Sequence, residues 1–577
     1  MELNPEQSKK AIEQYVREKT AAMKQRQRFA TAWVKNEQLY NGTPTTTLIT
    51  RSNIHVPKVF EAVNTASARM GRLPELEFHT KNEEDENAAT IMKHLYLYDA
   101  RRSRLDEIFR NSKVECGLYS RGIIQLIPGN NGNRFELVDT LSFLISPIAN
   151  TIRTARNCGK QFIYKTIDEI KEEADEKEYD KKVIVQMEQD KVANDKTVRN
   201  ANSQDQSLRN LRLAYLGLQD TSMLGIDIVE LTEWYTWFTF DKEKGPEQVV
   251  MTVADDKYLL RCLSLKEVGL PRWPFAAYAT YPRGVAFWVP SVADIHRDPN
   301  LATDVTINQM IDNNTYRNFG MIFVDSGAGL SQSSITPRPL GVTKINTNGG
   351  KIKDRVWQFT PPEISQSIQT ATYINGIADN ASGISSIPAG KRSRTSVTEI
   401  ATNNAIVEEK NNDFKENINI AFEDLGQLYA DTICMNLTTP RKVKIYDKQE
   451  ITLNGVTKEN FNGVTFICIA QSAENATEAR ALKQKAAQEL FQELKDDPEI
   501  PNQKFLRENL MHNFGLTEDQ IGKAFEGTAK PPMPEGGAPQ EGTSPAGSGI
   551  NVGNPMNPAG RALAEVQQKA QTLVQKH

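Results

Sequence analysis

The sequence is short of the residues from which most enzyme and metal sites are built. Its 577 residues include 5 cysteines and 6 histidines. The cysteines are far apart and form no CxxC pair, and no HExxH motif is present. The sequence therefore predicts neither a disulfide framework nor a zinc site, and it fits a reduced compartment. No metal and no cofactor are expected.

Long apolar runs and a strong net charge are missing as well. No stretch of about eighteen apolar residues occurs and the first ten residues lack the apolar core of a signal peptide, so no membrane span is expected. The formal net charge is −4, which predicts that any contact with DNA comes from a local patch. The hydrophobic content of 39% is enough for a buried core, and the length allows roughly three or four domains.

The most informative stretch is 360–437, which predicts a helix, a basic loop and a very long second helix. The first helix begins with a capping box at Thr360 and ends at Ser382-Gly383. Its apolar stripe is expected at Ile364, Ile368, Ala371, Ile374 and Ala378. A second capping box at Ser396 opens the long helix, which continues to about 436 because no proline interrupts it. Such a helix would be about 60 Å long, which is more typical of a large assembly than of a compact enzyme. Its buried stripe is expected at Phe414, Ile418, Ala421, Leu425, Leu428 and Thr432.

The rest of the chain predicts an α+β protein. Helices are expected at 5–42, 58–72, 83–102, 105–118, 168–179, 299–319, 473–494, 505–514 and 518–525, with a short helical turn starting at Ser291. In the first of these helices Val16 is expected to face inward and Arg26 to lie on the polar face. Strands are expected at 122–127, 135–145, 161–166, 227–240, 247–253, 257–263, 321–324, 441–446 and 464–469, with a turn at Asn454-Gly455 between the last two. The segment 351–359 is expected to be mostly extended. The segment 183–222 is interpreted as a polar, partly mobile surface insertion. A disordered tail at 528–558 and a terminal amphipathic helix at 559–575 are also expected.

No motif supports a catalytic hypothesis. Gly390-Lys391 suggests a phosphate-binding loop, but Ser385 and Arg392 stand where that motif needs a glycine and a serine or threonine. Asp294, His296 and Asp298 lie together at a helix start, where capping is far more common than metal binding. The charged run at 169–176 is interpreted as a solvated helix face.

The loop 384–395 is the candidate functional segment. It carries Lys391, Arg392 and Arg394 between two capped helices. One interpretation is a solvated turn. The other is a finger that contacts phosphates, which would be weak on one chain but would form a dense positive girdle if repeated around a ring.

The order of these elements resembles that of a tailed-bacteriophage portal protein, the head-to-tail connector. The likeness begins with the helix that contains Trp33 and ends Tyr40-Asn41-Gly42, continues through Arg51-Ser52-Asn53 and Pro57, and covers roughly 24–473. The resemblance implies a multidomain subunit of a ring, which begins with an N-terminal helix and α/β wing at 1–290 and has a polar insertion at about 168–222. A first stem helix at 291–319, a clip at 320–359, a second stem helix at 360–383 and a tunnel loop at 384–395 would follow. The remainder would comprise the long helix and return strands of the wing at 396–472, a helical crown at 473–527 and a Pro/Gly-rich tail with a terminal helix at 528–577.

The resemblance also implies a function. A portal is a ring, expected here to be a dodecamer, at the capsid vertex of the virion, and it is assembled in the host cytoplasm. Viral DNA passes through it as double-stranded DNA during packaging and ejection. Its implied partners are the terminase large subunit, connector or adaptor proteins and the major capsid protein. Lys391, Arg392 and Arg394 would face the DNA, and the docking residues of the clip would be Lys344, Lys351, Lys353 and Arg355.

Two alternatives stay open at the level of the sequence. One is another virion ring or scaffold protein without a DNA channel. The other is a nucleic-acid-processing enzyme subunit, which would need a nucleotide-binding motif set or a carboxylate metal cluster, and neither is visible.

Overall fold

The computed structural model describes residues 4–42, 52–81, 85–129, 132–193, 210, 228–240, 243, 245–318, 322–324, 350–351, 356–358, 365–383, 397–437, 441–446, 450–456, 458–461 and 463–471. The chain divides into two units, Met1–Glu489 and Leu490–His577, and all described residues belong to the first. The helices predicted after 473, the tail and the terminal helix therefore lie outside the described residues.

The first helix, α1 (Pro5–Tyr40), is confirmed, but two of its side chains were assigned to the wrong face. Asn4 caps the helix as part of a capping box. Val16, expected inside, is 41% exposed. Arg26, expected on the polar face, is fully buried and donates from Nη1 to the carbonyl oxygens of Leu141 and Phe143 over 2.6 and 2.8 Å. These carbonyls replace the water that the guanidinium loses on burial.

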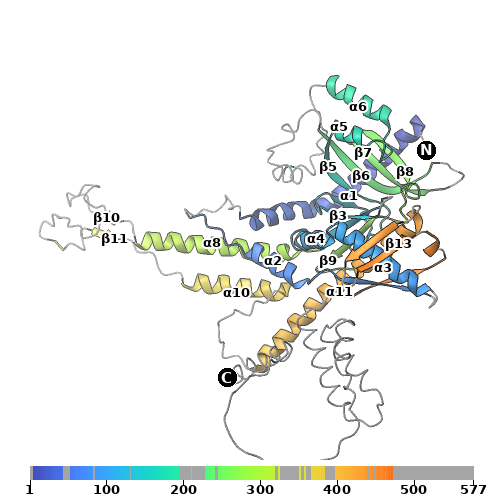
Figure 1. Ribbon diagram of the computed structural model, residues 1–577. Helices are drawn as coiled ribbons and strands as arrows, with labels where there is room; N and C mark the ends of the chain where they lie inside the picture. Colours follow the sequence, from blue (N-terminus) through green and yellow to red (C-terminus); the bar gives the residue numbers. More distant parts are fainter. Residues whose placement is uncertain are drawn as a thin grey trace, which may run out of the picture. The chain divides into compact units, whose positions relative to one another are not determined.

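Two antiparallel sheets form the body of the described unit (Figure 1). The larger sheet has the order β4 (Phe143–Ile145), β5 (Cys158–Thr166), β6 (Ile228–Phe238), β7 (Glu247–Ala254) and β8 (Tyr258–Ser264). The smaller has the order β3 (Arg134–Val138), β2 (Arg121–Ile127) and β9 (Phe275–Ala279). α4 (Leu105–Tyr119) packs on β2 and β3, and α2 (Lys58–Arg69) and α3 (Glu86–Arg102) contact α4.

The single strand predicted at 135–145 is wrong, because β3 and β4 belong to different sheets. Asp139 begins a turn between them: its Oδ1 accepts from Leu141 N over 3.2 Å, and its carbonyl oxygen accepts from Ser142 N over 3.0 Å. An aspartate that bonds to the backbone two residues ahead favours a turn over a continuing strand. This turn carries the chain from one sheet to the other.

The segment predicted as a charged helix and a polar insertion is partly built into the body. α5 (Ile167–Glu172) is shorter than the helix predicted at 168–179, and α6 (Lys181–Ala193) begins within the region interpreted as an insertion. Ile184 and Met187 of α6 are buried in a cluster with residues of β6 and β8. Spaced three residues apart, they anchor one face of α6 on the sheet. Residues 194–227, apart from 210, lie outside the described residues.

α8 (Val292–Asn318) is one helix, although a short turn and a separate helix from Pro299 were predicted. Its start is as predicted: Ser291 Oγ accepts from Asp294 N over 3.1 Å, and Asp294 Oδ2 accepts from Ser291 N over 2.9 Å. Pro299 lies inside the helix and removes one N–H. The helix nevertheless continues, because tertiary packing on α1, α2, α4 and α10 (Ser365–Ser382) outweighs the missing bond.

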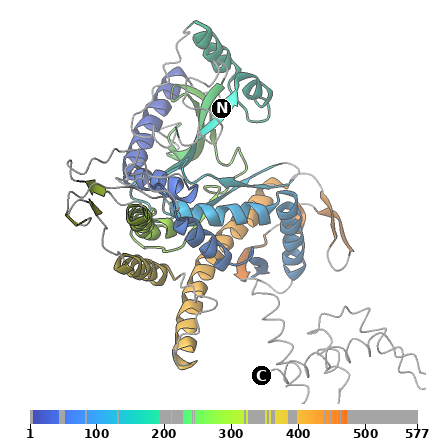
Figure 2. The ribbon, with the colours of Figure 1, turned by 90° about the vertical axis from the view of Figure 1, so that its left-hand side faces the viewer.

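α8 and α10 lie side by side and form a two-helix arm (Figure 1). The strands β10 (Ile322–Val324) and β11 (Val356–Gln358) pair with each other beyond the end of α8. Figure 2 views this arm nearly along the helix axes. The extended stretches predicted at 321–324 and 351–359 are therefore confirmed where they are described.

α11 (Val397–Asn436) is the predicted long helix, with 40 residues and a length of about 60 Å. All six side chains of its predicted stripe are buried: Phe414, Ile418, Ala421, Leu425, Leu428 and Thr432. The helix packs against β9 and β14 (Phe466–Gln471). β14 pairs with β1 (Glu75–Thr80), a strand that the sequence did not predict.

The return strands differ from the prediction in their pairing. β12 (Arg441–Tyr446) pairs with β13 (Glu450–Val456), and a 3₁₀ turn, Lys458–Phe461, follows. Asn454-Gly455 lies inside β13, so the turn predicted there is wrong.

Candidate channel and assembly site

A ladder of side chains on α8 holds the extended segment that precedes α2. At its centre, Asn308 Oδ1 accepts from Ile54 N over 2.7 Å while its Nδ2 donates to the Ile54 carbonyl oxygen over 2.8 Å. Every fourth residue of α8 makes such a contact, and residues at this spacing share one helix face. The other rungs are Asp312 to Ser52 N (3.0 Å), Asp304 to Val56 N (2.8 Å) and Asn300 to Val59 N (3.0 Å).

The ladder can form because the extended segment and α8 have nearly equal repeat lengths along their axes. Two residues of extended chain span about 6.6 Å, and four residues of α-helix span about 6.0 Å. Side-chain amide and carboxylate groups of α8 thus occupy the positions that a neighbouring strand would otherwise fill. Asn308 and Asn300 are fully buried and Asp304 is nearly so, which keeps water from competing for these bonds.

The ladder also joins three helices. α2 has no cap from its own N-cap residue, Pro57, and Asn300 of α8 caps it instead by accepting from Val59 N. His55 completes the junction: Nδ1 lies 2.9 Å from Asp304 Oδ2, and Nε2 lies 2.9 Å from the carbonyl oxygen of Leu39 in α1. The base of α8 is therefore fixed to both α1 and α2.

A second polar contact links α8 to α10. His296 Nε2 lies 2.9 Å from Ser382 Oγ, and Ser382 Oγ donates to the Ala378 carbonyl oxygen over 2.9 Å. Asn375 Nδ2 donates to Thr303 Oγ1 over 2.9 Å farther along the pair. His296 does not cap α8 as predicted, although Asp294 does, and no cluster of metal-ligating side chains occurs in the part of the chain that the structure describes.

We expect His296 to make stability depend on pH. Burial lowers the pKa of His296 to about 4; the charge of Lys58 lowers it further, and Glu61 opposes this. Between about pH 6.5 and 4 the unfolded chain therefore binds a proton that the folded chain does not, so stability falls as the pH falls. From pH 7.5 to pH 5 the loss attributable to His296 is about 2 kcal/mol.

The measurement is urea unfolding of the wild type and of His296→Gln at both pH values and at one protein concentration. The variant should lack this part of the pH dependence. Asp379 lies 3.9 Å from His296 Nδ1, and burial raises the pKa of that carboxyl, which contributes with the opposite sign. Asp379→Asn, measured in parallel, separates the two. An unchanged pH dependence in His296→Gln would contradict the prediction.

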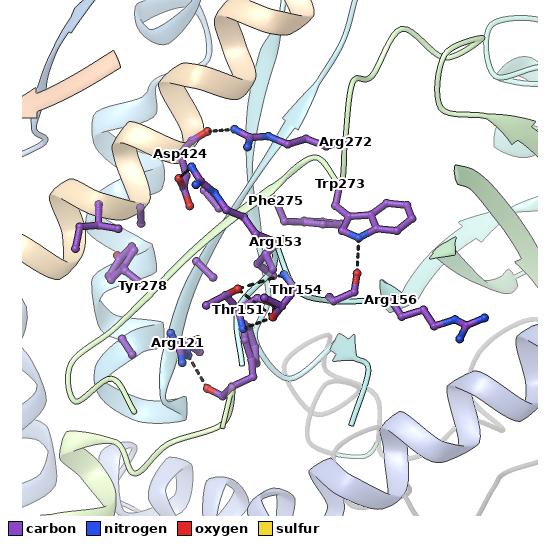
Figure 3. Close-up of a pocket in the computed structure, with 18 of the residues that line it drawn as sticks. Arg121, Thr151, Arg153, Thr154, Arg156, Arg272, Trp273, Phe275, Tyr278 and Asp424 are labelled. Carbon is purple, nitrogen blue, oxygen red and sulfur yellow. Dashed lines mark hydrogen bonds and ion pairs between the residues drawn. The ribbon is translucent and has the colours of Figure 1, made fainter. Parts of the chain in front are cut away.

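A pocket of about 840 Å³ lies between α11 and the two sheets (Figure 3). Its walls come from the loop 151–156, the end of β6 at Trp237, the segment 272–279 with β9, and α11 between Asn417 and Asp424. Arg153 forms an ion pair with Asp424, and Arg272 Nη2 donates to the Asp424 carbonyl oxygen over 3.0 Å. We call this the basic pocket.

The basic pocket carries more positive than negative charge. Arg121, Arg153, Arg156 and Arg272 line it, whereas Asp424 is its only carboxylate among the described residues. Burial lowers the pKa of Arg272, and the neighbouring charge of Arg153 lowers it further. Arg156 is exposed and has no partner within the described residues. No His, Cys, Ser or Lys among the described residues lines the pocket.

The residues proposed from sequence fall mostly outside the described ranges. This applies to Lys391, Arg392 and Arg394 of the tunnel loop and to Lys344, Lys353 and Arg355 of the clip. Lys351 is described and is exposed.

The ladder and the basic pocket were missed by sequence reasoning. The ladder had a detectable signal, because Asn300, Asp304, Asn308 and Asp312 repeat every four residues on a predicted helix. The pocket had none, because its arginines come from segments far apart in the sequence.

The described residues form an α+β protein with a projecting pair of helices. A long two-helix arm is fixed to an α+β body by buried polar contacts, and the described residues contain neither a metal cluster nor, in any described helix, a stretch long and apolar enough to cross a membrane. A family model described as phage SU10 portal protein matches residues 75–454, which are 380 of the 577 residues. The chain therefore belongs to the phage SU10 portal protein family.

Membership confirms the resemblance to tailed-phage portals, over a shorter range than the 24–473 expected. Portal proteins are structural rather than enzymatic; their place is the capsid vertex of the virion, in an oligomeric assembly with capsid and DNA. A search of curated proteins found no match.

Proposed function

We propose that the chain forms a dodecameric portal ring whose central channel conducts double-stranded DNA during packaging and ejection. In this proposal α8 and α10 are the stem helices, the β10–β11 pair belongs to the clip, and α11 crosses the wing. The clip docks the terminase large subunit and later the connector proteins, with Lys344, Lys351, Lys353 and Arg355 as contact residues. Assembly takes place in the host cytoplasm, and the ring contacts the major capsid protein.

The observation that carries the proposal is the family match, which spans the arm and all of α11. The surface of α10 supports it. Ala371 and Ala378 are buried, but Ile368, expected on the same inward stripe, is 48% exposed. Tyr373 and Ile377 are 71% and 52% exposed. Large apolar side chains that stay exposed on a helix are typical of a surface that neighbouring subunits cover.

The ring itself is tested by light scattering and negative-stain microscopy of the purified full-length chain. Twelve copies of a 64.7-kDa chain give roughly 780 kDa, and the images should show a ring with a central hole. A monomer at all protein and salt concentrations would refute the proposal. A ring without a central hole would favour the scaffold alternative.

The proposed DNA-facing role of the tunnel loop predicts a packaging defect. Replacing Lys391, Arg392 and Arg394 together by Ala removes three cations from every subunit. We expect the yield of DNA-filled particles to fall on the order of tenfold, with ring assembly unchanged, because phosphate contacts repeated around the channel are lost.

The matched control is the triple substitution of Lys9, Lys10 and Lys35 by Ala, which removes the same charge from exposed positions of α1. It should leave packaging unchanged. Normal packaging and DNA retention in the tunnel-loop variant would remove the loop from the mechanism while leaving the ring proposal intact.

A further inference from the structure

The residues 168–182 form an acidic surface that the proposed function does not use. They contain eight carboxylates and four lysines, a net charge of −4. Glu172 and Glu176 are exposed and have no ion-pair partner among the described residues. This acidic lobe, as we call it, comprises α5, the turns after it and the start of α6, and it is anchored on the sheet through Ile170 and Ile184.

The acidic lobe and the basic pocket lie at opposite ends of the same strand. Ile228, the first residue of β6, pairs with Thr166, the residue before α5. Trp237, nine residues farther along β6, lines the basic pocket. At about 3.3 Å per residue the two surfaces are about 30 Å apart. Figure 1 shows α5 and α6 at the end of the sheet away from α11. The two charged surfaces therefore do not neutralise each other within one chain.

The basic pocket has the chemistry of a protein contact rather than of a DNA contact. Its volume of about 840 Å³ corresponds to a space of about 9 Å on a side, into which several side chains fit but a duplex does not, since the DNA major groove alone is about 12 Å wide. Beside its arginines it exposes two apolar side chains, Trp237 (38%) and Ile420 (54%). Apolar surface surrounded by cations suits an acidic protein segment that also carries apolar side chains.

We propose that the basic pocket of one subunit receives the acidic lobe of a second copy, an inference that rests on the proposed ring. The lobe supplies the carboxylates that Arg153, Arg156 and Arg272 face, and the half-exposed Val185 of α6 supplies an apolar side chain. Two different, complementary patches on one chain make a head-to-tail contact, which closes into a ring when the rotation between copies permits. Because the patches lie at opposite ends of β6, each copy can use both at once.

The test is a charge swap in the full-length chain. The pocket variant is Arg153→Glu with Arg156→Glu, and the lobe variant is Glu172→Lys with Glu176→Lys. Each places like charges across the contact, so each should raise the concentration needed for half-maximal ring formation at least about tenfold. An equimolar mixture of the two should recover to within about threefold of the wild type, because alternating copies then pair only opposite charges.

The control is Glu13→Lys with Glu136→Lys, two exposed carboxylates on α1 and β3, which should assemble like the wild type. Circular dichroism of each variant checks folding, and recovery in the mixture excludes misfolding as the cause of the defect. Wild-type rings that persist in both variants, or a mixture that stays dissociated, would overturn the inference while leaving the ring proposal standing. Failure of the wild type to form rings would instead refute the proposed function.

Discussion

Replacing Asp304 by Ala is expected to lower the free energy of unfolding by about 4 kcal/mol. Asp304 is 2% exposed, and its Oδ1 accepts a hydrogen bond from Val56 N. Its Oδ2 accepts from Asn300 Nδ2 and lies 2.9 Å from His55 Nδ1. Alanine leaves these buried groups without an acceptor and without water. The measurement is the urea midpoint of the purified chain at one protein concentration and neutral pH.

Two further variants separate this effect from a general effect of removing a carboxylate from α8. Asp298→Ala removes a side chain that is 81% exposed on the same helix, and it should change stability by less than about 0.5 kcal/mol. Asp304→Asn keeps one acceptor oxygen and should lie between the two. Equal midpoints for Asp304→Ala and Asp298→Ala would show that the ladder contributes nothing.

Replacing Gly426 by Leu should cost about 3 kcal/mol, although leucine is the better helix former. A Cβ at this position would lie 2.2 Å from Cys468 Sγ and 2.8 Å from Leu76 Cδ1. Gly426 therefore marks the place where α11 touches the sheet formed by β1 and β14. A larger side chain would push the helix off that sheet, which the thermal midpoint of the variant would report.

Gly376→Leu is the matched control, because this glycine also lies in a helix, α10, and a Cβ there would meet nothing within 4 Å. It should leave stability unchanged or raise it by up to about 1 kcal/mol. A loss of equal size at both positions would mean that leucine harms these helices in general and that close packing at Gly426 is not the cause.

The long periodic elements could be predicted from the sequence because local pattern and burial agree there. The stripe of α11 from Phe414 to Thr432 is regular, and every one of its residues is buried. Gly426 is the one glycine of that helix, but the sequence does not show why a glycine is needed there, because Leu76 and Cys468 lie far away in the sequence. The order of the elements was also enough to indicate the family, which the match over residues 75–454 confirms.

The missed features depend on partners that a local pattern does not contain. β1 is only six residues long, and its partner β14 lies almost four hundred residues later. Arg26 appears polar in a helical pattern, yet it is buried because the carbonyl groups of Leu141 and Phe143 lie within its reach. Pro299 looks like a helix start, and only the packing of α8 against its neighbours keeps the helix intact on both sides of it.

The ladder on α8 acts as a length gauge for the chain. Its repeats differ by about 0.6 Å per step, so the mismatch is about 1.2 Å over the two extended steps from Ser52 to Val56. A third extended step would bring it to nearly 2 Å, which is more than a hydrogen bond tolerates without adjustment. Asn300, the first of the four helix residues, accepts its hydrogen bond from Val59 N in α2 instead of from the extended chain. Insertions and deletions can therefore preserve the ladder only in whole steps. Between Ser52 and Val56 a step is a pair of residues, and on α8 it is one turn. The segment 52–59 precedes the residues 75–454 that the family model matches, and the ladder holds it in register with α8, which lies within them.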